Sequence, residues 1–447
     1  MPLPSFRLSQ VEKHWTKFSP KKSLNYLGTS AFMLKSLPRE YTKTITILFN
    51  KCASKGTIFD DSKHAKVICL SKDGIYPDET KLRPISLLSN LGKWFERCVH
   101  EQIQDWCKES GIFYDEQSGL TPNRRLQTRI LTICEDLRLT IVANNQPALA
   151  IFVDFLSAFD RLWYPALIAN LIELEILLPL IKFIYEWLQK RTMSVYYGEL
   201  VSKSSNIYMY VGALQGSILS ATLFRLHLHF LPKYFSRFCS YLFADDLAIL
   251  LKGTLEKKLS ENIVELEEQA KIAMTALSIF SKNNLLPVNI KKTKAMLIHG
   301  AVSPSIPKVF YREHPIEIVS SFKYLGIEIR TKLGWGNYIK ARLMKIQNTY
   351  NALKQIFRQI PMSLIKIRRQ LFCAFAIPHF VWLFRISFYF TENQQREIEH
   401  TYLCGLRIVY NLCGWDNYSV MVLTREKSLM DYLFNYWKVQ KTSKLFK

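Results

Sequence analysis

The sequence lacks the marks of a secreted or membrane-spanning protein. Its nine cysteines are odd in number and none has Cys-x-x-Cys spacing, which argues against a disulfide framework and a zinc finger. Residues 1–7 have no apolar core of the kind that a signal peptide needs. The longest apolar run near the end, residues 371–384, contains Pro378 and is too short for a span of about 20 residues. We therefore expect a buried helix there, no membrane partner, and reduced thiols in the nucleus or cytoplasm.

Acidic residues are scarce relative to basic ones. Lys and Arg number 60 against 37 Asp and Glu, which gives a formal net charge of +23. A field of that sign favours polyanions, either nucleic acid or an acidic membrane surface. Aromatic residues make up 13% of the chain, which suits base stacking, although most of them must lie in the core. The 447 residues hold no repeat or low-complexity linker, so we expect two or three domains that pack together.

Two adjacent carboxylates, Asp245 and Asp246, lie between the apolar runs 241–244 and 247–250. Short runs of aromatic and aliphatic residues predict two strands that meet at a tight turn. The carboxylates then lie at the tip of a hairpin, where like charges repel unless a cation binds between them. A solvated Asp-Asp turn is the alternative for the isolated pair.

A third carboxylate, Asp154, follows the apolar run 148–153, which predicts a buried strand. A carboxylate at the end of a buried strand is costly unless it is paired or binds a metal. If the two strands are neighbours, Asp154 faces Asp245 across a small gap. Two magnesium ions about 4 Å apart in that gap would bind both the attacking and the leaving oxygens of a phosphoryl transfer.

Seven segments follow one another in a fixed order over roughly residues 60–330. They are His64–Lys72, Arg83–Ser89, Asp154–Phe159, Gly212–Leu219, Phe243–Asp246, Asn289–Met296 and Ser321–Ile327. Together they resemble the ordered motifs of the reverse transcriptases of non-LTR (LINE-type, jockey-like) retrotransposons. The resemblance implies an α+β right-hand polymerase fold with fingers, a palm built on an antiparallel sheet, and a helical thumb. We expect the N-terminal extension and fingers over residues 1–145, the palm over 146–330 and the thumb over 331–447.

The resemblance also assigns a role to each matching residue. Asp154, Asp245 and Asp246 would bind two Mg²⁺ ions, with Mn²⁺ as the alternative, and Lys292 would protonate the leaving pyrophosphate. Phe159 matches the steric gate that favours deoxynucleotides; a core aromatic is the alternative. The other matches are the nucleotide-binding residues Lys72, Arg83, Gln215 and Gly216 and the primer-grip residues Tyr324, Leu325 and Gly326. The alternative for Lys72 and Arg83 is a solvated surface charge, and for Gln215 and Gly216 an ordinary loop. The alternative for the primer-grip residues is a hairpin that simply contains a glycine. The implied partners are an RNA template, a DNA primer or target DNA, and deoxynucleoside triphosphates.

Several positions depart from the family pattern. Leu214 replaces a proline before Gln-Gly, Ser220 and Ala221 replace Gly-Pro, Leu120 and Thr121 replace Phe-Arg after Gln-x-Gly, and Arg330 replaces an aspartate. Prolines and glycines that stiffen loops are lost while the carboxylates remain, which indicates a diverged copy.

The ordered motifs and the three carboxylates together predict an RNA-directed DNA polymerase. A decayed nucleic-acid-binding remnant and an RNA-directed RNA polymerase are the alternatives.

The family's endonuclease region and Cys/His-rich tail are not found in this sequence. We therefore expect a fragment, the product of a truncated element, or a separate polymerase module. Endonuclease activity would then come from a missing region or another chain.

Local patterns predict further helices. Ser86 is a candidate cap for a helix whose apolar positions recur from Leu91 to Ile103. Residues 164–190 are rich in Leu and Ile, and residues 255–282 form an amphipathic pattern with acidic residues on the outside. Residues 331–447 are expected to be helical and basic.

Overall fold

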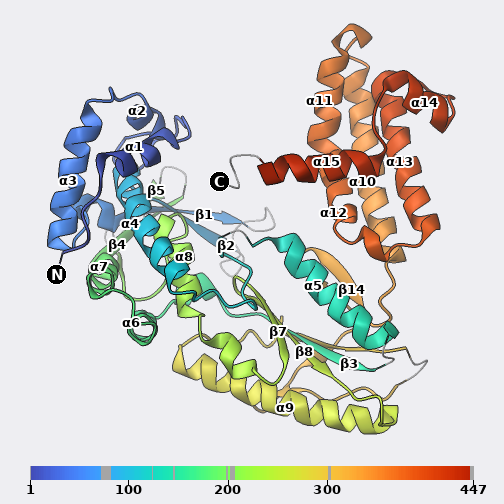
Figure 1. The fold of residues 1–447 in the computed structure, drawn as a ribbon, viewed down its shortest axis with the longest axis horizontal. Coiled ribbons are helices and arrows are strands. Elements are labelled where there is room, and N and C mark those ends of the chain that lie inside the picture. Colours follow the sequence, from blue (N-terminus) through green and yellow to red (C-terminus); the bar gives the residue numbers. More distant parts are fainter. Residues whose placement is uncertain are drawn as a thin grey trace.

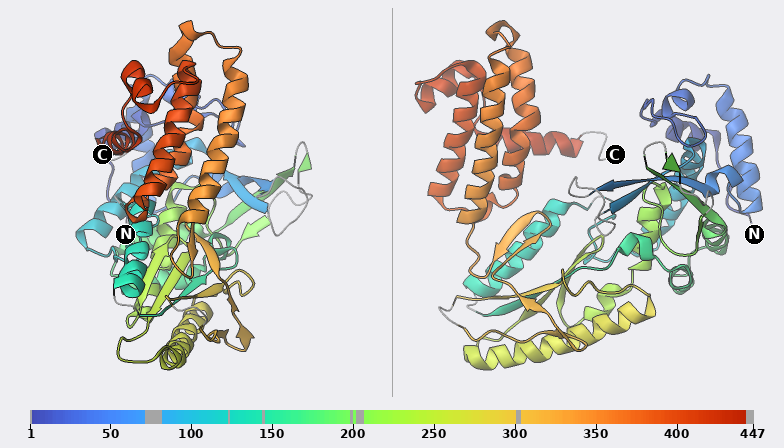
Figure 2. Two further views of the ribbon diagram at one scale, coloured as in Figure 1. Left: turned by 90° about the vertical axis from the view of Figure 1, so that its right-hand side faces the viewer. Right: turned by 180° about the vertical axis from the view of Figure 1, so that it is seen from behind.

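The computed structural model describes residues 2–71, 82–122, 124–143, 146–197, 200–201, 207–300 and 304–442. Helices and strands alternate along most of the chain, and helices alone follow residue 336. Figures 1 and 2 show the N-terminal helices on one side and the C-terminal helices on the other, with a central sheet between and below them. The long helix α9 (Leu259–Asn283) runs beneath that sheet (Figure 1).

The central sheet has five strands, and their spatial order places the predicted carboxylates side by side. The order is β12 (Glu317–Ile318), β9 (Lys294–Ile298), β3 (Ala148–Val153), β8 (Asp246–Lys252) and β7 (Cys239–Phe243). All neighbours are antiparallel except β12 and β9. The predicted strand over residues 148–153 and the predicted hairpin around Asp245 are confirmed, and the two strands are neighbours.

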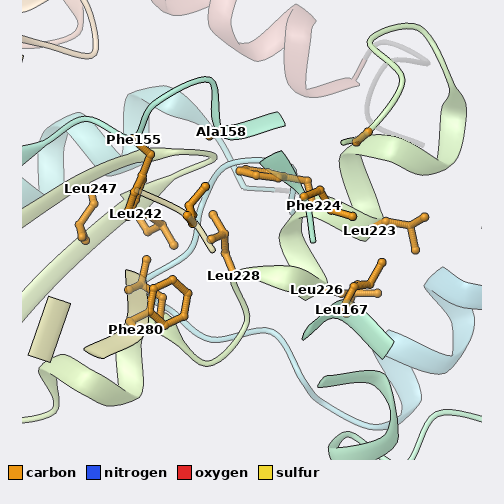
Figure 3. Packing of buried hydrophobic residues seen from close by; sticks show 14 of the residues in the cluster. Phe155, Ala158, Leu167, Leu223, Phe224, Leu226, Leu228, Leu242, Leu247 and Phe280 are labelled. Carbon is orange, nitrogen blue, oxygen red and sulfur yellow. The ribbon is translucent and has the colours of Figure 1, made fainter. Parts of the chain in front are cut away.

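The central strand β3 is buried on both faces, which explains its uninterrupted apolar sequence. Leu149, Ile151 and Val153 face one hydrophobic cluster, which also contains residues of α8 (Ile218–His227) and α9. The alternate residues face a second cluster, shared with α5 (Leu126–Arg138) and the C-terminal helices. Figure 3 shows the first cluster near the end of β3, where Phe155, Leu242 and Leu247 approach Phe280 of α9.

A second sheet contains β1 (His64–Ser71), β2 (Leu82–Leu87), β4 (Arg191–Tyr197), β5 (Leu200–Val201) and β6 (Ile207–Met209). Strand β1 lies between β2 and β4, and β4 also pairs with β6. The helices on the N-terminal side of the molecule are α1 (Leu8–Thr16), α2 (Ala31–Lys35), α3 (Tyr41–Lys55) and α4 (Asn90–Glu109).

The expected helix cap at Ser86 is wrong. Ser86 is buried in strand β2 opposite Val67 of β1, and the Ser89 side chain caps α4 by accepting a hydrogen bond from Gly92 N–H over 3.2 Å. Pro84 favours extended backbone before it, and pairing with β1 continues the strand through Ser86. The helical apolar pattern itself is confirmed, and the helix begins at Asn90.

Two predicted helical stretches are each divided in two. Residues 164–190 form α6 (Tyr164–Glu173) and α7 (Leu178–Leu188), with Glu175 in a left-handed conformation between them. The apolar run 371–384 falls across α11 (Ile365–Phe375) and α12 (Ile377–Phe384). It is therefore not one buried helix. Pro378 lacks the N–H that would continue α11, so a new helix starts.

The C-terminal region is helical, as expected. Its other helices are α10 (Gly336–Phe357), α13 (Glu392–Tyr410), α14 (Asn417–Thr424) and α15 (Leu429–Thr442). Among the described helices, none has both the length and the apolar character needed to cross a membrane. The nine cysteines all lie in described segments, and none of them forms a disulfide.

Candidate active site

Three carboxylates lie near one another where β3 ends and β8 begins. Val153 pairs with Leu247, so Asp154 follows β3 beside the start of β8. Burial raises the pKa of the Asp245 carboxyl, and the charge of Asp154 raises it further. Asp246 is more exposed, but crowding by protein atoms and the charges of Asp245 and Asp154 raise its pKa to about 6. The three groups therefore repel one another, and a divalent cation would offset that repulsion.

The donor chemistry of these carboxylates suits Mg²⁺, which prefers oxygen ligands. Within the described segments, no group of three His, Cys, Asp or Glu side chains already converges as a complete metal site. Asp154 Oδ2 instead accepts a hydrogen bond from Asn289 Nδ2 over 2.8 Å. The residues fit a cation by charge and type, and Asp154, Asp245 and Asp246 are those that would hold it.

The segment 289–293 holds Asp154 in place. Asn289 N–H donates to the Asp154 carbonyl oxygen over 2.7 Å, and Asp154 N–H donates to the buried Thr293 hydroxyl over 3.2 Å. Sequence reasoning assigned a role here only to Lys292, whose side chain is exposed. It missed the support that Asn289 and Thr293 give, because these contacts join residues that lie 135 and 139 positions apart in the sequence.

The loop before α8 contains Gln215 and Gly216 and packs against the segment that follows Asp154, which contains Phe159: Ala213 N–H donates to the Phe159 carbonyl oxygen over 2.7 Å. Gln215 Nε2 donates to Asp160 Oδ1 over 3.1 Å, and the Gln215 carbonyl oxygen accepts from Ser86 N–H over 2.9 Å. Phe159 stacks on Phe224 with ring centroids 4.2 Å apart. Gly216 follows Gln215 on the exposed side of the loop.

The remaining predicted nucleotide-binding residues are Arg83 and Lys72. Arg83 is exposed on β2, close enough for its charge to lower the pKa of Asp245 against the effect of burial. Lys72 lies outside the described residues.

The predicted primer-grip motif forms the hairpin of β13 (Ser321–Tyr324) and β14 (Ile327–Arg330). The Tyr324 hydroxyl is buried and donates to the carbonyl oxygens of Tyr241, over 3.3 Å, and Asp246, over 3.4 Å. This ring therefore supports the hairpin that carries the carboxylates. Leu325 and Gly326 form the tip, both in left-handed conformations.

The chain matches the family described as reverse transcriptase (RNA-dependent DNA polymerase) over residues 70–329. It is 24% identical over 399 residues to the probable RNA-directed DNA polymerase from transposon BS of Drosophila melanogaster, covering 87% of this chain and 42% of that protein. It is 25% identical over 350 residues to the RNA-directed DNA polymerase from mobile element jockey of the same species, covering 76% of this chain and 37% of that protein.

The solved structure of apo telomerase from Candida tropicalis is also similar. Its sequence is 13% identical, the alignment covers 91% of this chain and 72% of that chain, and the TM-score is 0.43.

The family match covers more than half of the 447 residues and contains the three carboxylates, the loop around Gln215 and the Tyr324 hairpin. The chain spans less than half the length of the two transposon proteins. The chain therefore belongs to the reverse transcriptase family, on its non-LTR (LINE-type) branch, and its α+β architecture is the right-hand polymerase fold of that family.

Proposed function

We propose that this chain is an RNA-directed DNA polymerase that adds deoxynucleotides to a primer 3′-hydroxyl. The observation that carries the proposal is the position of Asp154 beside Asp245 and Asp246 on adjacent strands, near enough for its charge to add to the effect of burial in raising the pKa of both. Such a carboxylate cluster is what two-metal phosphoryl transfer needs. The relatives from transposon BS and mobile element jockey are both named as RNA-directed DNA polymerases, which supports the same chemistry.

The metal ions of this proposal are two Mg²⁺, with Mn²⁺ as a substitute. Bound there, they would lower the pKa of the attacking hydroxyl and offset the charge on the leaving pyrophosphate. Asp154 would be kept in orientation by Asn289, which donates to its carboxylate over 2.8 Å. Arg83 would bind the triphosphate; the effect of its positive charge on the pKa of Asp245 supports this role.

The remaining roles follow the positions of the side chains. Phe159, stacked on Phe224, would exclude a 2′-hydroxyl, and Gln215 would contact the incoming nucleotide from a loop anchored to Ser86. Lys292 is exposed and would reach the pyrophosphate from solvent. The tip formed by Leu325 and Gly326 would contact the primer, the buried Tyr324 would support that tip from behind, and Lys72 would assist Arg83.

The proposal extends to the partners and the division of the chain. A net charge of +23 favours an RNA template and a DNA primer or target DNA. We assign residues 1–145 to the N-terminal extension and fingers, 146–330 to the palm and 331–447 to the thumb. An endonuclease would come from a region outside this sequence or from another chain. The nine cysteines, none of which forms a disulfide, fit a nuclear or cytoplasmic location.

Primer extension on an RNA template with deoxynucleotides and Mg²⁺ tests the proposal, with Asp154→Ala as the control. We expect extension that is lost in the variant by a factor of about 10³ or more, because a metal ligand is removed. A folded chain that binds RNA and extends nothing would contradict the proposal and favour the non-catalytic remnant. Extension with ribonucleotides at least as fast as with deoxynucleotides would favour an RNA-directed RNA polymerase.

A further inference from the structure

The amide side chain of Gln117 binds both backbone polar groups of Ala244, the residue before Asp245. Gln117 Oε1 accepts a hydrogen bond from Ala244 N–H over 3.1 Å, and Nε2 donates to the Ala244 carbonyl oxygen over 3.2 Å. The same Oε1 accepts from Gly119 N–H over 2.8 Å. Gln117 is buried, so little water competes for these bonds.

The backbone around Gln117 fixes the side chain against the turn. Ser118 N–H donates to the Leu242 carbonyl oxygen over 2.9 Å, and Leu242 N–H donates to the Glu116 backbone carbonyl oxygen over 2.8 Å. A Cβ added at Gly119 would lie 2.0 Å from the Ala244 nitrogen. Residues 116–119 therefore run beside β7 at a distance that leaves no room for a side chain at position 119.

Ala244 has a backbone conformation that needs such support. Its φ of 57° lies in the left-handed region, which is unfavourable for alanine because Cβ approaches the following carbonyl oxygen. The conformation of Ala244 sets the direction in which Asp245 leaves the turn. Without partners for its N–H and C=O, Ala244 would relax and turn Asp245 away from Asp154.

We propose that Gln117 is a positioning residue that holds the Ala244 turn so that Asp245 and Asp154 bind metal ions together. This inference rests on the proposed function and adds a residue that touches neither metal nor substrate. Partners that orient a metal ligand typically change metal affinity by 10–100-fold when removed. Gln117 acts through the backbone of Ala244.

Asn262 offers a matched control elsewhere in the molecule. It is buried, its Oδ1 accepts from Thr254 N–H over 2.7 Å, and its Nδ2 donates to the carbonyl oxygens of Thr254 and Lys257 over 2.9 and 3.0 Å. Thr254 follows β8 at the end opposite to Asp246. Loss of this amide removes the same kind of contact without touching the carboxylates.

The experiment measures Mn²⁺ binding to the full chain from the electron paramagnetic resonance signal of free Mn²⁺, with urea unfolding in parallel. The variants are Gln117→Met, Asn262→Leu and Asp245→Asn. We expect Gln117→Met to weaken Mn²⁺ binding by about tenfold or more. Asn262→Leu should lose similar stability but keep its Mn²⁺ affinity within about twofold, because distant sites act independently. If Gln117→Met does not fold, Gln117→Asn replaces it, since its shorter amide cannot reach Ala244.

The outcomes separate the two proposals. Loss of Mn²⁺ binding in Asp245→Asn together with unchanged affinity in the folded Gln117 variant would overturn the positioning role and leave the metal site standing. Equal weakening by Gln117→Met and Asn262→Leu would also overturn it, since any structural damage would then suffice. Unchanged Mn²⁺ binding in Asp245→Asn would contradict the metal site and, with it, the proposed function.

Discussion

The carboxylate of Glu96 accepts a hydrogen bond from the Ser217 hydroxyl over 2.7 Å. It also accepts from Ile218 N–H over 2.9 Å and from the Trp187 indole N–H over 3.0 Å. Glu96 lies in α4 with only 2% of its surface exposed, and Ser217 caps α8 directly after Gln215 and Gly216. One buried carboxylate therefore anchors the loop that contains Gln215 and Gly216 to a helix of the N-terminal region.

Replacing Glu96 should destabilise the protein strongly. Glu96→Ala leaves three donors without an acceptor, and we expect a loss of about 3 kcal/mol in the free energy of unfolding. Asp105→Ala on the same helix is the control, because Asp105 is exposed and its replacement should change stability by less than about 0.5 kcal/mol. Urea unfolding measures both. Equal losses would show that the Glu96 contacts do not anchor the loop.

The adjacency of Asp154 and Asp245 was predictable because the signals for the strands that carry them are local. The apolar run before Asp154 and the runs around Asp245 each define a strand within a few residues, and burial on both faces forces the pairing. Ser86 was misassigned because a local cap signal was weaker than strand pairing with Val67, which lies far away in sequence. Propensity is only a weak guide where tertiary pairing decides.

The supports of the site were not predictable because they join distant parts of the chain. Asn289 reaches Asp154 across 135 residues, and Ser217 reaches Glu96 across 121. No periodicity marks either partner, since a single buried polar contact leaves no repeating pattern. Pairing of this kind is visible only once the fold brings the elements together.

The ring of Phe159 should control the choice of sugar. If the proposed function holds, Phe159→Val makes room for a 2′-hydroxyl, and the kcat/KM ratio for deoxynucleotides over ribonucleotides should fall by about tenfold or more. The control is Phe183→Leu, because the Phe183 side chain of α7 is fully buried. This substitution should lower stability and leave the ratio unchanged. Steady-state primer extension with each nucleotide measures both. An unchanged ratio in Phe159→Val would make Phe159 a core aromatic.

Buried neutral histidines should make the protein sensitive to acid. His227 is fully buried, neither of its ring nitrogens has a hydrogen-bond partner among the residues that the structure describes, and burial lowers its pKa to about 4. Because the folded pKa lies below the unfolded value of about 6.5, the stabilising contribution is complete above pH 6.5 and is lost as pH falls toward 4. Burial is also the main cause that lowers the pKa values of His100 and His229 to about 4.

His227→Leu should remove one of these groups from the acid transition. Urea unfolding measured from pH 7 to pH 4 should show a shallower loss of stability, by at most about 1.4 kcal/mol per pH unit. His314→Gln is the control because His314 is exposed. The same pH dependence in His227→Leu and the parent chain would assign the acid sensitivity to other groups.

The turn at Gly326 should depend on the absence of a side chain. Its φ is +84°, and an added Cβ would lie 2.6 Å from the Trp382 ring of α12. Gly326→Ala should therefore cost about 2 kcal/mol or more through strain and overpacking. Gly334→Ala is the matched control, since a Cβ there meets no atom within 4 Å, and it should change stability by less than about 0.5 kcal/mol.

A double-mutant cycle with Trp382 separates the clash from the backbone strain. Trp382→Leu makes room for the added methyl group, so the double variant Gly326→Ala with Trp382→Leu should lose less stability than the sum of the single losses, by about 1 kcal/mol. The strain of a left-handed alanine remains in both backgrounds. Strict additivity would mean that Trp382 moves aside freely. In that case the contact between the Gly326 tip and α12 would not hold the C-terminal helices against the hairpin that supports the carboxylates.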